Sequence, residues 1–310
     1  MKGLFDISPF VSAAMKDGRP VVALETTLVT HGLPHPEGVG AAAELEAEVV
    51  ATGAVPATIG VLDGRVRVGL SAAELERLAV APDTAKLNLS NLAAQVAAGR
   101  PGSTTVAATL AVAAHVGIRV FATGGIGGVH RGAGETGDVS ADLHALGRYA
   151  VAVVCAGAKA VLDLPMTVEM LESLGVPVYG LGTDEFPAFY RRASGLPVDQ
   201  RFDDLDALAG AVGTHWNLGL GTGVVVANPI PLEHEMPLEL YEEALAAALA
   251  EAAGKKIRGR AVTPFLLERL RALTEGRSVF SNLALLRHNA RVAGALAGAL
   301  ARPRSERRAR

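Results

Sequence analysis

The residue types best suited to ligand binding are concentrated in residues 121–132, FATGGIGGVHRG, and in the polar positions that follow. The apolar run 118–122 is typical of a buried strand, and glycines occupy positions 124, 125, 127 and 128 directly after it. Closely spaced glycines let backbone N–H groups approach an anion or a sugar, and open α/β sheets bind ligands where strands end in such loops. We therefore predict a binding site here; the alternative is a mobile surface loop.

Two other apolar runs also end in a candidate catalytic side chain. Glu25 follows the run 20–24, and by itself it fits either a capping or paired carboxylate or a catalytic acid. Lys159 follows the run 150–156, where desolvation favours the neutral amine that a nucleophile needs. The alternative for Lys159 is a side chain that extends its ammonium group to water.

Lysine is scarce in this chain, which makes each one more informative. The chain has 310 residues and only six lysines, among them Lys86 and Lys159. Lys86 fits a solvated side chain and a phosphate contact equally well. His31 and His35 are four residues apart, but Gly32 and Pro34 disfavour a helix there, so we expect no zinc pair.

Composition limits the classes of function. The hydrophobic content of 50% suffices for a large core, and the net charge of −3 gives no reason to expect nucleic acid or a membrane surface as partner. The single cysteine, Cys155, cannot form an internal disulfide and is expected to be a packed apolar residue, which suits the cytoplasm. No signal-peptide pattern or membrane-length apolar run is found.

The elements that must position these residues alternate along the chain. Strands are predicted at 20–24, 58–62, 65–69, 118–122, 150–156, 176–181 and 223–227, and helices at 9–16, 38–52, 71–78, about 104–116, 139–147, 167–174, 205–218, 237–253, 263–274 and 279–301. This alternation predicts an α/β fold, a three-layer α/β/α sandwich with a largely parallel or mixed central sheet. We expect a single domain over 1–301 and a basic, disordered tail over 302–310.

Several long motifs carry a resemblance to a known family. Residues 21–27 (VVALETT), 121–131, 139–142 (VSAD), 154–159 (VCAGAK), 226–231 (VANPIP) and 263–267 (TPFLL) resemble the pseudouridine-5′-phosphate glycosidases, which are indigoidine synthase A-like proteins. The similarity runs from about residue 7 to residue 300. The chain lacks a dinucleotide-binding fingerprint, because His130 stands where the third glycine would be, and it has no P-loop.

The resemblance implies an activity and a set of roles. The reaction is the reversible cleavage of pseudouridine 5′-phosphate to uracil and ribose 5-phosphate through a covalent lysine–ribose adduct. Lys159 matches the nucleophile, Glu25 the proton donor and Asp138 the ligand of a divalent metal, for which one carboxylate and several waters suit manganese or magnesium better than zinc. The positions matching substrate contacts are Lys86, Val106, Ser140, Ala141, Asp142 and Asn289. The family also implies a homotrimer.

The sequence departs from the family pattern at two places. Leu89, Ser90 and Asn91 replace a basic pair and an aspartate after Lys86, and His288 replaces an asparagine beside Asn289. Two other functions fit the fold: a related enzyme acting on another phosphorylated glycoside, as in indigoidine pathways, and a non-catalytic sugar-phosphate binding protein. The joint presence of Glu25, Asp138 and Lys159 argues against mere binding.

Overall fold

The computed structural model describes residues 3–255, 257 and 262–302. Its strands form an eleven-stranded sheet in the order β1-β4-β3-β2-β7-β8-β11-β9-β10, with β6 paired to β3 and β5 paired to β6. The strands are β1 (Phe5–Ile7), β2 (Val21–Leu24), β3 (Val55–Leu62), β4 (Arg65–Val68), β5 (Ala85–Leu87), β6 (Gly102–Thr104), β7 (Val120–Ala122), β8 (Ala152–Cys155), β9 (Val178–Leu181), β10 (Gln200–Phe202) and β11 (Val224–Ala227).

Four central strands determine where the site lies. Strands β2, β7, β8 and β11 are parallel neighbours, and every residue in them is buried. Their register pairs Leu24 with Ala122, Ala122 with Val154 and Val154 with Val226. Because parallel strands end at the same edge of a sheet, the residues that follow all four strands meet there.

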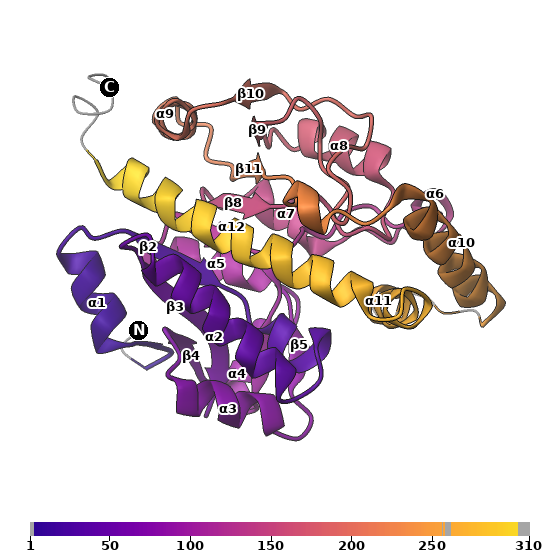
Figure 1. Cartoon of the computed structure of the whole chain (residues 1–310). Coiled ribbons are helices and arrows are strands. Elements are labelled where there is room, and N and C mark those ends of the chain that lie inside the picture. The colour runs from indigo at the N-terminus through magenta and orange to yellow at the C-terminus, as the bar shows by residue number, and fades with distance from the viewer. Residues whose placement is uncertain (1–2, 256, 258–261, 303–310) are drawn as a thin grey trace.

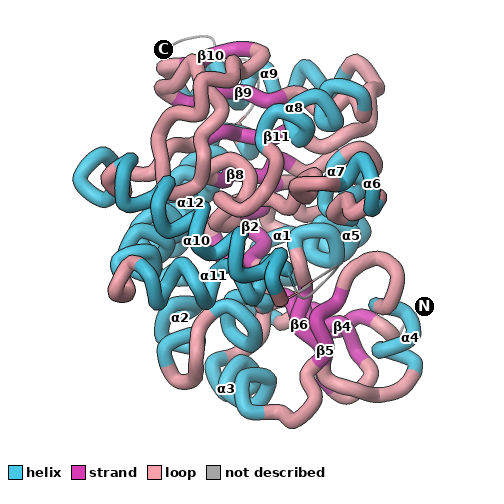
Figure 2. The backbone as a smooth tube through the Cα atoms, turned by 90° about the vertical axis from the view of Figure 1, so that its right-hand side faces the viewer, coloured by secondary structure: helices cyan, strands magenta, loops and turns pink. Residues whose placement is uncertain are grey.

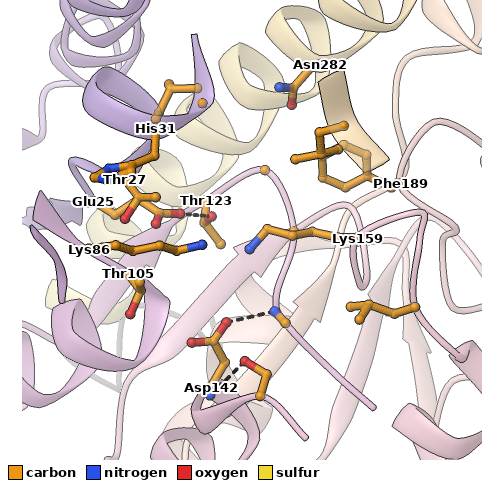
Figure 3. A pocket seen from close by; sticks show the side chains of 18 of the residues that line it. Glu25, Thr27, His31, Lys86, Thr105, Thr123, Asp142, Lys159, Phe189 and Asn282 are labelled. Carbon is orange, nitrogen blue, oxygen red and sulfur yellow. Dashed lines mark hydrogen bonds between the residues drawn. The ribbon is translucent and has the colours of Figure 1, made fainter. Parts of the chain in front are cut away.

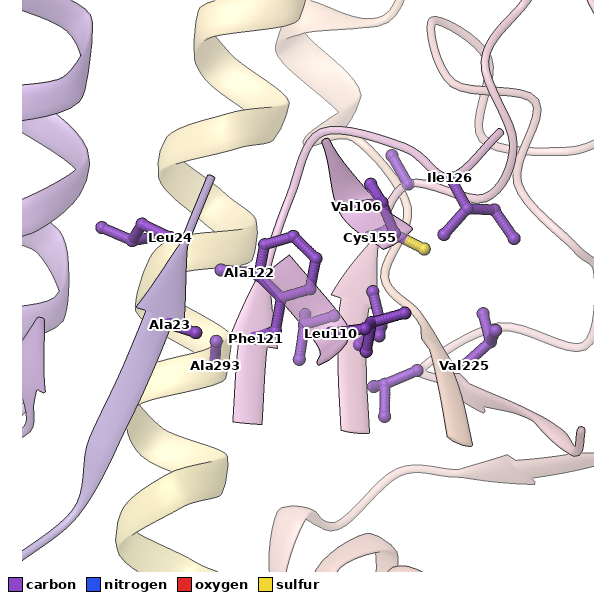
Figure 4. Close-up of a cluster of buried hydrophobic side chains, with 14 of the residues drawn as sticks. Ala23, Leu24, Val106, Leu110, Phe121, Ala122, Ile126, Cys155, Val225 and Ala293 are labelled. Carbon is purple, nitrogen blue, oxygen red and sulfur yellow. The ribbon is translucent and has the colours of Figure 1, made fainter. Parts of the chain in front are cut away.

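Helices cover both faces of this sheet, which confirms the predicted three-layer α/β/α sandwich. The long helix α12 (Arg277–Ala301) lies across one face beside α2 (Glu37–Val50), and α5 (Val106–Val116) with α7 (Ala141–Leu146) lies on the other (Figure 1). The core between the layers includes Phe121 and Val225 from the strands, Leu110 from α5 and Ala293 from α12 (Figure 4). Cys155 belongs to this core, and burial raises the pKa of its thiol to about 12.

The remaining helices surround these layers. They are α1 (Pro9–Lys16), α3 (Ala72–Val80), α4 (Leu92–Ala97), α6 (Ala133–Thr136), α8 (Leu164–Ser173), α9 (Leu205–Asn217), α10 (Leu238–Gly254) and α11 (Val262–Leu273), with a π-helical turn η1 (Leu28–Gly32) and a 3₁₀ turn η2 (Leu232–His234). Among the helices described, none has the length and apolar character needed to cross a membrane.

Local sequence signals explain several of these boundaries. Ser71 and Glu74 form a capping box at the start of α3. A hairpin joins β3 to β4, and both of its turn residues have positive φ, 52° at Asp63 and 68° at Gly64. Such a turn matches the right-handed twist of the flanking strands.

The structure also differs from the sequence-based prediction. Strands β1, β5, β6 and β10 were not predicted, because each has three residues and no apolar run of its own. Figure 2 shows β4, β5 and β6 beside α4 at one corner of the molecule. A helix was disfavoured near His31, whereas residues 28–32 form a π-helical turn that ends before Pro34. Of the expected basic tail, residues 303–310 lie outside the described residues.

Candidate active site

A cavity of about 760 Å³ opens at the carboxyl ends of the central strands. Seven of the nine predicted site residues line it: Glu25, Lys86, Asp138, Ser140, Ala141, Asp142 and Lys159. The first and the last of them in the sequence, Glu25 and Lys159, are more than 130 positions apart. The sheet brings these segments together, and several of the side chains point into one space (Figure 3).

Glu25 follows β2 at the base of the cavity. Its Oε1 accepts a hydrogen bond of 2.5 Å from the hydroxyl of Thr123, which follows the neighbouring strand β7. Burial raises the pKa of Glu25; the positive charge of Lys159 and the Thr123 hydrogen bond oppose this effect. A carboxyl group with a raised pKa keeps its proton closer to neutral pH, as a general acid requires.

Three threonine hydroxyl groups hold the chain that follows Glu25. Thr26 donates to the carbonyl of Ile59 at 2.7 Å and accepts from the backbone N–H of Thr104 at 2.9 Å. Thr27 donates to the carbonyl of Thr104 at 2.7 Å, and Thr30 donates to Ser103 at 2.7 Å. These bonds attach the end of β2 and the π-helical turn to β6, so the backbone around Glu25 is held rigidly.

Two lysines face one another across the cavity. Lys159 lies in the loop after β8, and its backbone N–H donates to the carbonyl of Ile126 at 3.0 Å. Lys86 comes from β5, and Figure 3 shows the ammonium ends of both side chains directed into the same space. Burial by surrounding protein lowers the pKa of Lys86, as does the nearby charge of Lys159, while Glu25 and Asp142 act in the opposite direction.

Asp142 joins the glycine-rich loop to helix α5. Its Oδ2 accepts the backbone N–H of Gly127 at 2.8 Å, and its Oδ1 accepts the backbone N–H of Ala107 at 2.9 Å. A Cβ at position 127 would lie 2.2 Å from Ser140 Oγ and 2.6 Å from Asp142 Oδ2. Gly127 therefore allows a close approach of protein side chains, and its N–H is used by Asp142 and not by a ligand.

Asp138 is the residue of this cavity that could hold a hydrated divalent cation. Its half-buried side chain lines the cavity, and within the described part of the chain its carboxylate accepts no hydrogen bond. His130 lies beside it, since the backbone N–H of His130 donates to the Asp138 carbonyl at 3.0 Å. Among the described residues no three acidic, histidine or cysteine side chains are grouped as a metal site. One carboxylate with waters fits manganese or magnesium, not a structural zinc.

Two predicted substrate contacts lie outside the cavity lining. Val106 is fully buried at the start of α5, and Thr105, the residue that caps this helix, lines the cavity in its place. Asn289 on α12 is 1% exposed, and its Nδ2 donates to the carbonyl of Thr123 at 2.8 Å. The side chain of Asn289 is therefore hydrogen-bonded within the protein, which makes direct contact of this group with a substrate a poor fit.

Sequence reasoning missed several residues that line the cavity: Thr105, Thr123, His31 and Phe189. Thr123 carries the same signal as Glu25, because it is the first polar residue after a buried strand. Phe189 has a positive φ of 63° and packs against the loop at Gly125, where a Cβ would lie 2.6 Å from its ring. No local sequence pattern predicts the contact between Phe189 and Gly125, since 64 positions separate the two residues.

A partly buried carboxyl group and two lysines at the carboxyl edge of an α/β sheet define an enzyme-type site. The family profile described as indigoidine synthase A like protein matches residues 10–299. The chain therefore belongs to the family of indigoidine synthase A-like proteins, as the sequence motifs predicted.

Named relatives and solved structures agree with this assignment. The chain is 54% identical to a pseudouridine-5′-phosphate glycosidase of Methylobacterium nodulans, over 97% of this chain and 90% of that protein. It superposes with a TM-score of 0.90 and 38% identity on the prealnumycin C-glycosynthase AlnA in complex with ribulose 5-phosphate, over 96% and 97% of the two chains. An indigoidine synthase A-like protein of Thermotoga maritima gives a TM-score of 0.87 at 35% identity, with the same coverage.

Proposed function

We propose that this protein is a pseudouridine-5′-phosphate glycosidase, which reversibly cleaves the C–C glycosidic bond of its substrate to give uracil and ribose 5-phosphate. The observation that carries the proposal is that Lys159 and Glu25 line one cavity. The 54% identity to a protein of that name supports the choice of substrate.

The chemistry of the bond explains why a lysine is needed. Uracil is attached through carbon, so no electronegative leaving atom assists the cleavage, and a pair of carboxylates alone is poorly equipped for it. In the proposed path, the ribose C1′–O4′ bond opens, O4′ takes up a proton from Glu25, and the Lys159 amine forms a bond to C1′ and returns one proton to the Glu25 carboxylate. The C1′–C5 bond then breaks, its electron pair leaves with uracil C5, which is protonated, and the nitrogen lone pair completes an iminium. Water hydrolyses the iminium to ribose 5-phosphate and frees Lys159.

Glu25 supplies the proton in this scheme. Because burial raises the pKa of Glu25, its carboxyl group still holds a proton near neutral pH. Lys159 is close enough for its charge to act on Glu25, so the carboxyl group lies near the carbon that Lys159 would attack. We assign substrate binding to Lys86, Ser140, Ala141 and Asp142, all of which line the same cavity. The ammonium group of Lys86 suits the phosphate or the ribose hydroxyls.

We extend the proposal to a metal ion and to assembly. Asp138, with His130 beside it, would hold one Mn²⁺, which when bound supplies positive charge to an anionic substrate. A homotrimer follows from the family resemblance, and the exposed apolar side chains Leu232 and Phe280, 70% and 74% exposed, suit a subunit contact. Sedimentation equilibrium would test the trimer. A cytoplasmic location is proposed from the single buried thiol, and cell fractionation would test it.

The test of the activity is trapping of the adduct. Borohydride added during turnover of pseudouridine 5′-phosphate should reduce the iminium and leave a sugar-phosphate mass on Lys159, identified by peptide mass spectrometry. Lys159→Ala should abolish uracil release and trapping while circular dichroism stays unchanged. Lys86→Ala is the matched control, since it removes the facing lysine; it should weaken substrate binding but leave trapping on Lys159 at saturating substrate.

Two outcomes would overturn the assignment. A trapped adduct on Lys86, or near-normal uracil release by Lys159→Ala, would show that Lys159 is not the nucleophile. Failure of the wild-type protein to release uracil, together with turnover of another phosphorylated glycoside, would favour the related pathway enzyme considered above.

A further inference from the structure

A continuous chain of buried hydrogen bonds connects helix α12 to Glu25. The Nδ2 group of Asn228 donates to Oδ1 of Asn289 at 2.8 Å, and Nδ2 of Asn289 donates to the carbonyl of Thr123 at 2.8 Å. The hydroxyl of Thr123 then donates to Oε1 of Glu25. Asn228, Asn289 and Thr123 are 2%, 1% and 3% exposed, so the bonds among these three residues are shielded from water, while Glu25 at the end of the chain of bonds lines the cavity.

The direction of each bond is determined by the chemistry of its groups. A backbone carbonyl only accepts, so the amide nitrogen of Asn289 must face Thr123, which leaves its oxygen to accept from Asn228. The backbone N–H groups of Thr123 and Asn228 donate to Val154 and Cys155 of β8, at 3.1 and 2.9 Å. Thr123 is therefore held on its N–H and its carbonyl, and its hydroxyl donates to Glu25.

We infer that Thr123 and Asn289 are positioning residues that orient the carboxyl group of Glu25 and stabilise its ionised form. The inference rests on the proposed role of Glu25 as proton donor. It also gives Asn289 a different task from the substrate contact expected from the family, because both ends of its amide are hydrogen-bonded within the protein.

The hydrogen bond from Thr123 matters because the site is otherwise unfavourable to a negative charge. Burial disfavours ionised Glu25, and the carboxylate of Asp142 does so too, whereas Lys159 and Lys86 favour ionisation. Thr123 adds a neutral donor that does not depend on the protonation of either lysine. A proton donor must also be able to release its proton, and this bond keeps the anionic product of that step accessible.

The test uses Thr123→Val, which removes the hydroxyl at similar volume. Loss of a hydrogen bond to an ionised group should move the alkaline limb of the kcat–pH profile upward by about one pH unit. Thr123→Ser keeps the hydroxyl and should restore the wild-type limb. Thr109→Val is the matched control, because it also deletes a buried hydroxyl, one that donates to Thr104 at 3.0 Å, and it should leave the limb in place.

A second measurement separates this inference from the proposed activity. Infrared titration of the free enzyme follows the carboxyl band of Glu25, assigned by its absence in Glu25→Gln, and needs no substrate. The titration should also move upward in Thr123→Val. If the wild type releases no uracil but the infrared titration shifts, the proposed activity fails and the positioning role stands. If neither the limb nor the titration moves, the positioning role is wrong.

Asn289→Ala tests the other end of the chain of bonds. Removing the amide should lower kcat and leave KM within a few-fold, because Thr123 loses its support while the cavity lining is intact. A large rise in KM with unchanged kcat would mean that Asn289 contacts the substrate, and would overturn the role given to it here.

Discussion

The carboxylate of Asp142 offers a sharp test of how the site is held together. Asp142 is 5% exposed, and each of its two oxygens accepts a backbone N–H, one from the glycine-rich loop and one from the first turn of α5. Asp142→Asn keeps the size of the side chain but has one oxygen only. Its NH₂ group must face one of the two N–H donors, so one hydrogen bond is lost and a buried donor is left without a partner.

The cost follows from those two losses. A hydrogen bond to a charged group contributes about 1.5–3 kcal/mol, and a buried unsatisfied donor costs about 1–3 kcal/mol, so we expect a loss of about 2.5–6 kcal/mol in the free energy of unfolding. Urea denaturation followed by circular dichroism measures this loss. Because Asp142 also lines the cavity, the variant should show weaker substrate binding by calorimetry.

Asp204→Asn is the control for this experiment. Asp204 caps helix α9 through one hydrogen bond to the backbone N–H of Ala207 at 2.7 Å. Asparagine caps helices about as well as aspartate, so this variant should stay within about 0.5 kcal/mol of the wild type. A loss below about 1 kcal/mol for Asp142→Asn, similar to that of the control, would refute the argument that two backbone donors depend on this carboxylate.

Two further predictions concern stability and metal binding. Glu46 on α2 accepts a hydrogen bond from Thr58, and burial raises its pKa above the unfolded value, so the folded state loses stability as pH rises from the ordinary glutamate range through the raised pKa. The glutamine of Glu46→Gln still accepts the hydrogen bond from Thr58 but does not titrate. The variant should therefore be as stable as the wild type at acid pH and increasingly more stable than the wild type toward neutral pH, measured as the free energy of unfolding. A difference between the two proteins that does not change with pH would contradict this. For the metal, Asp138→Asn should weaken Mn²⁺ binding by at least about 10- to 100-fold, the loss typical when a residue that only supports a metal ligand is changed. Calorimetry or electron paramagnetic resonance measures the affinity. Equal affinity in the variant and the wild type would rule out Asp138 as a ligand.

Much of the fold could be predicted because the central strands are short, continuous apolar runs between clear helices. The strands β2, β7, β8 and β11 have every residue buried, and buried parallel strands read as unbroken apolar sequence. The three-residue strands β1, β5, β6 and β10 contain too few residues for a pattern, and only their pairing with longer strands makes them strands.

The site was predictable to the extent that its residues follow strands directly. Glu25 and Lys159 stand just beyond β2 and β8, so the parallel sheet alone predicts that they meet. Asn289 and Thr123 are different, because their hydrogen bond joins positions 166 apart in the chain. Nothing in the local sequence tells whether an asparagine on a helix faces a cavity or a buried carbonyl. The glycine-rich sequence likewise does not predict that the N–H of Gly127 donates to Asp142.

Helix α12 has a consequence for the order in which the protein can become active during synthesis. Its 25 residues lie near the end of the chain, yet they pack on β2, β7 and β8 and hold Thr123 through Asn289. Chains emerge from the ribosome N-terminus first. Glu25 and Lys159 are thus made long before the helix that completes their surroundings, and the sheet edge stays uncovered until α12 has been released. A nascent chain that has already formed its strands would therefore be inactive until α12 has packed on them.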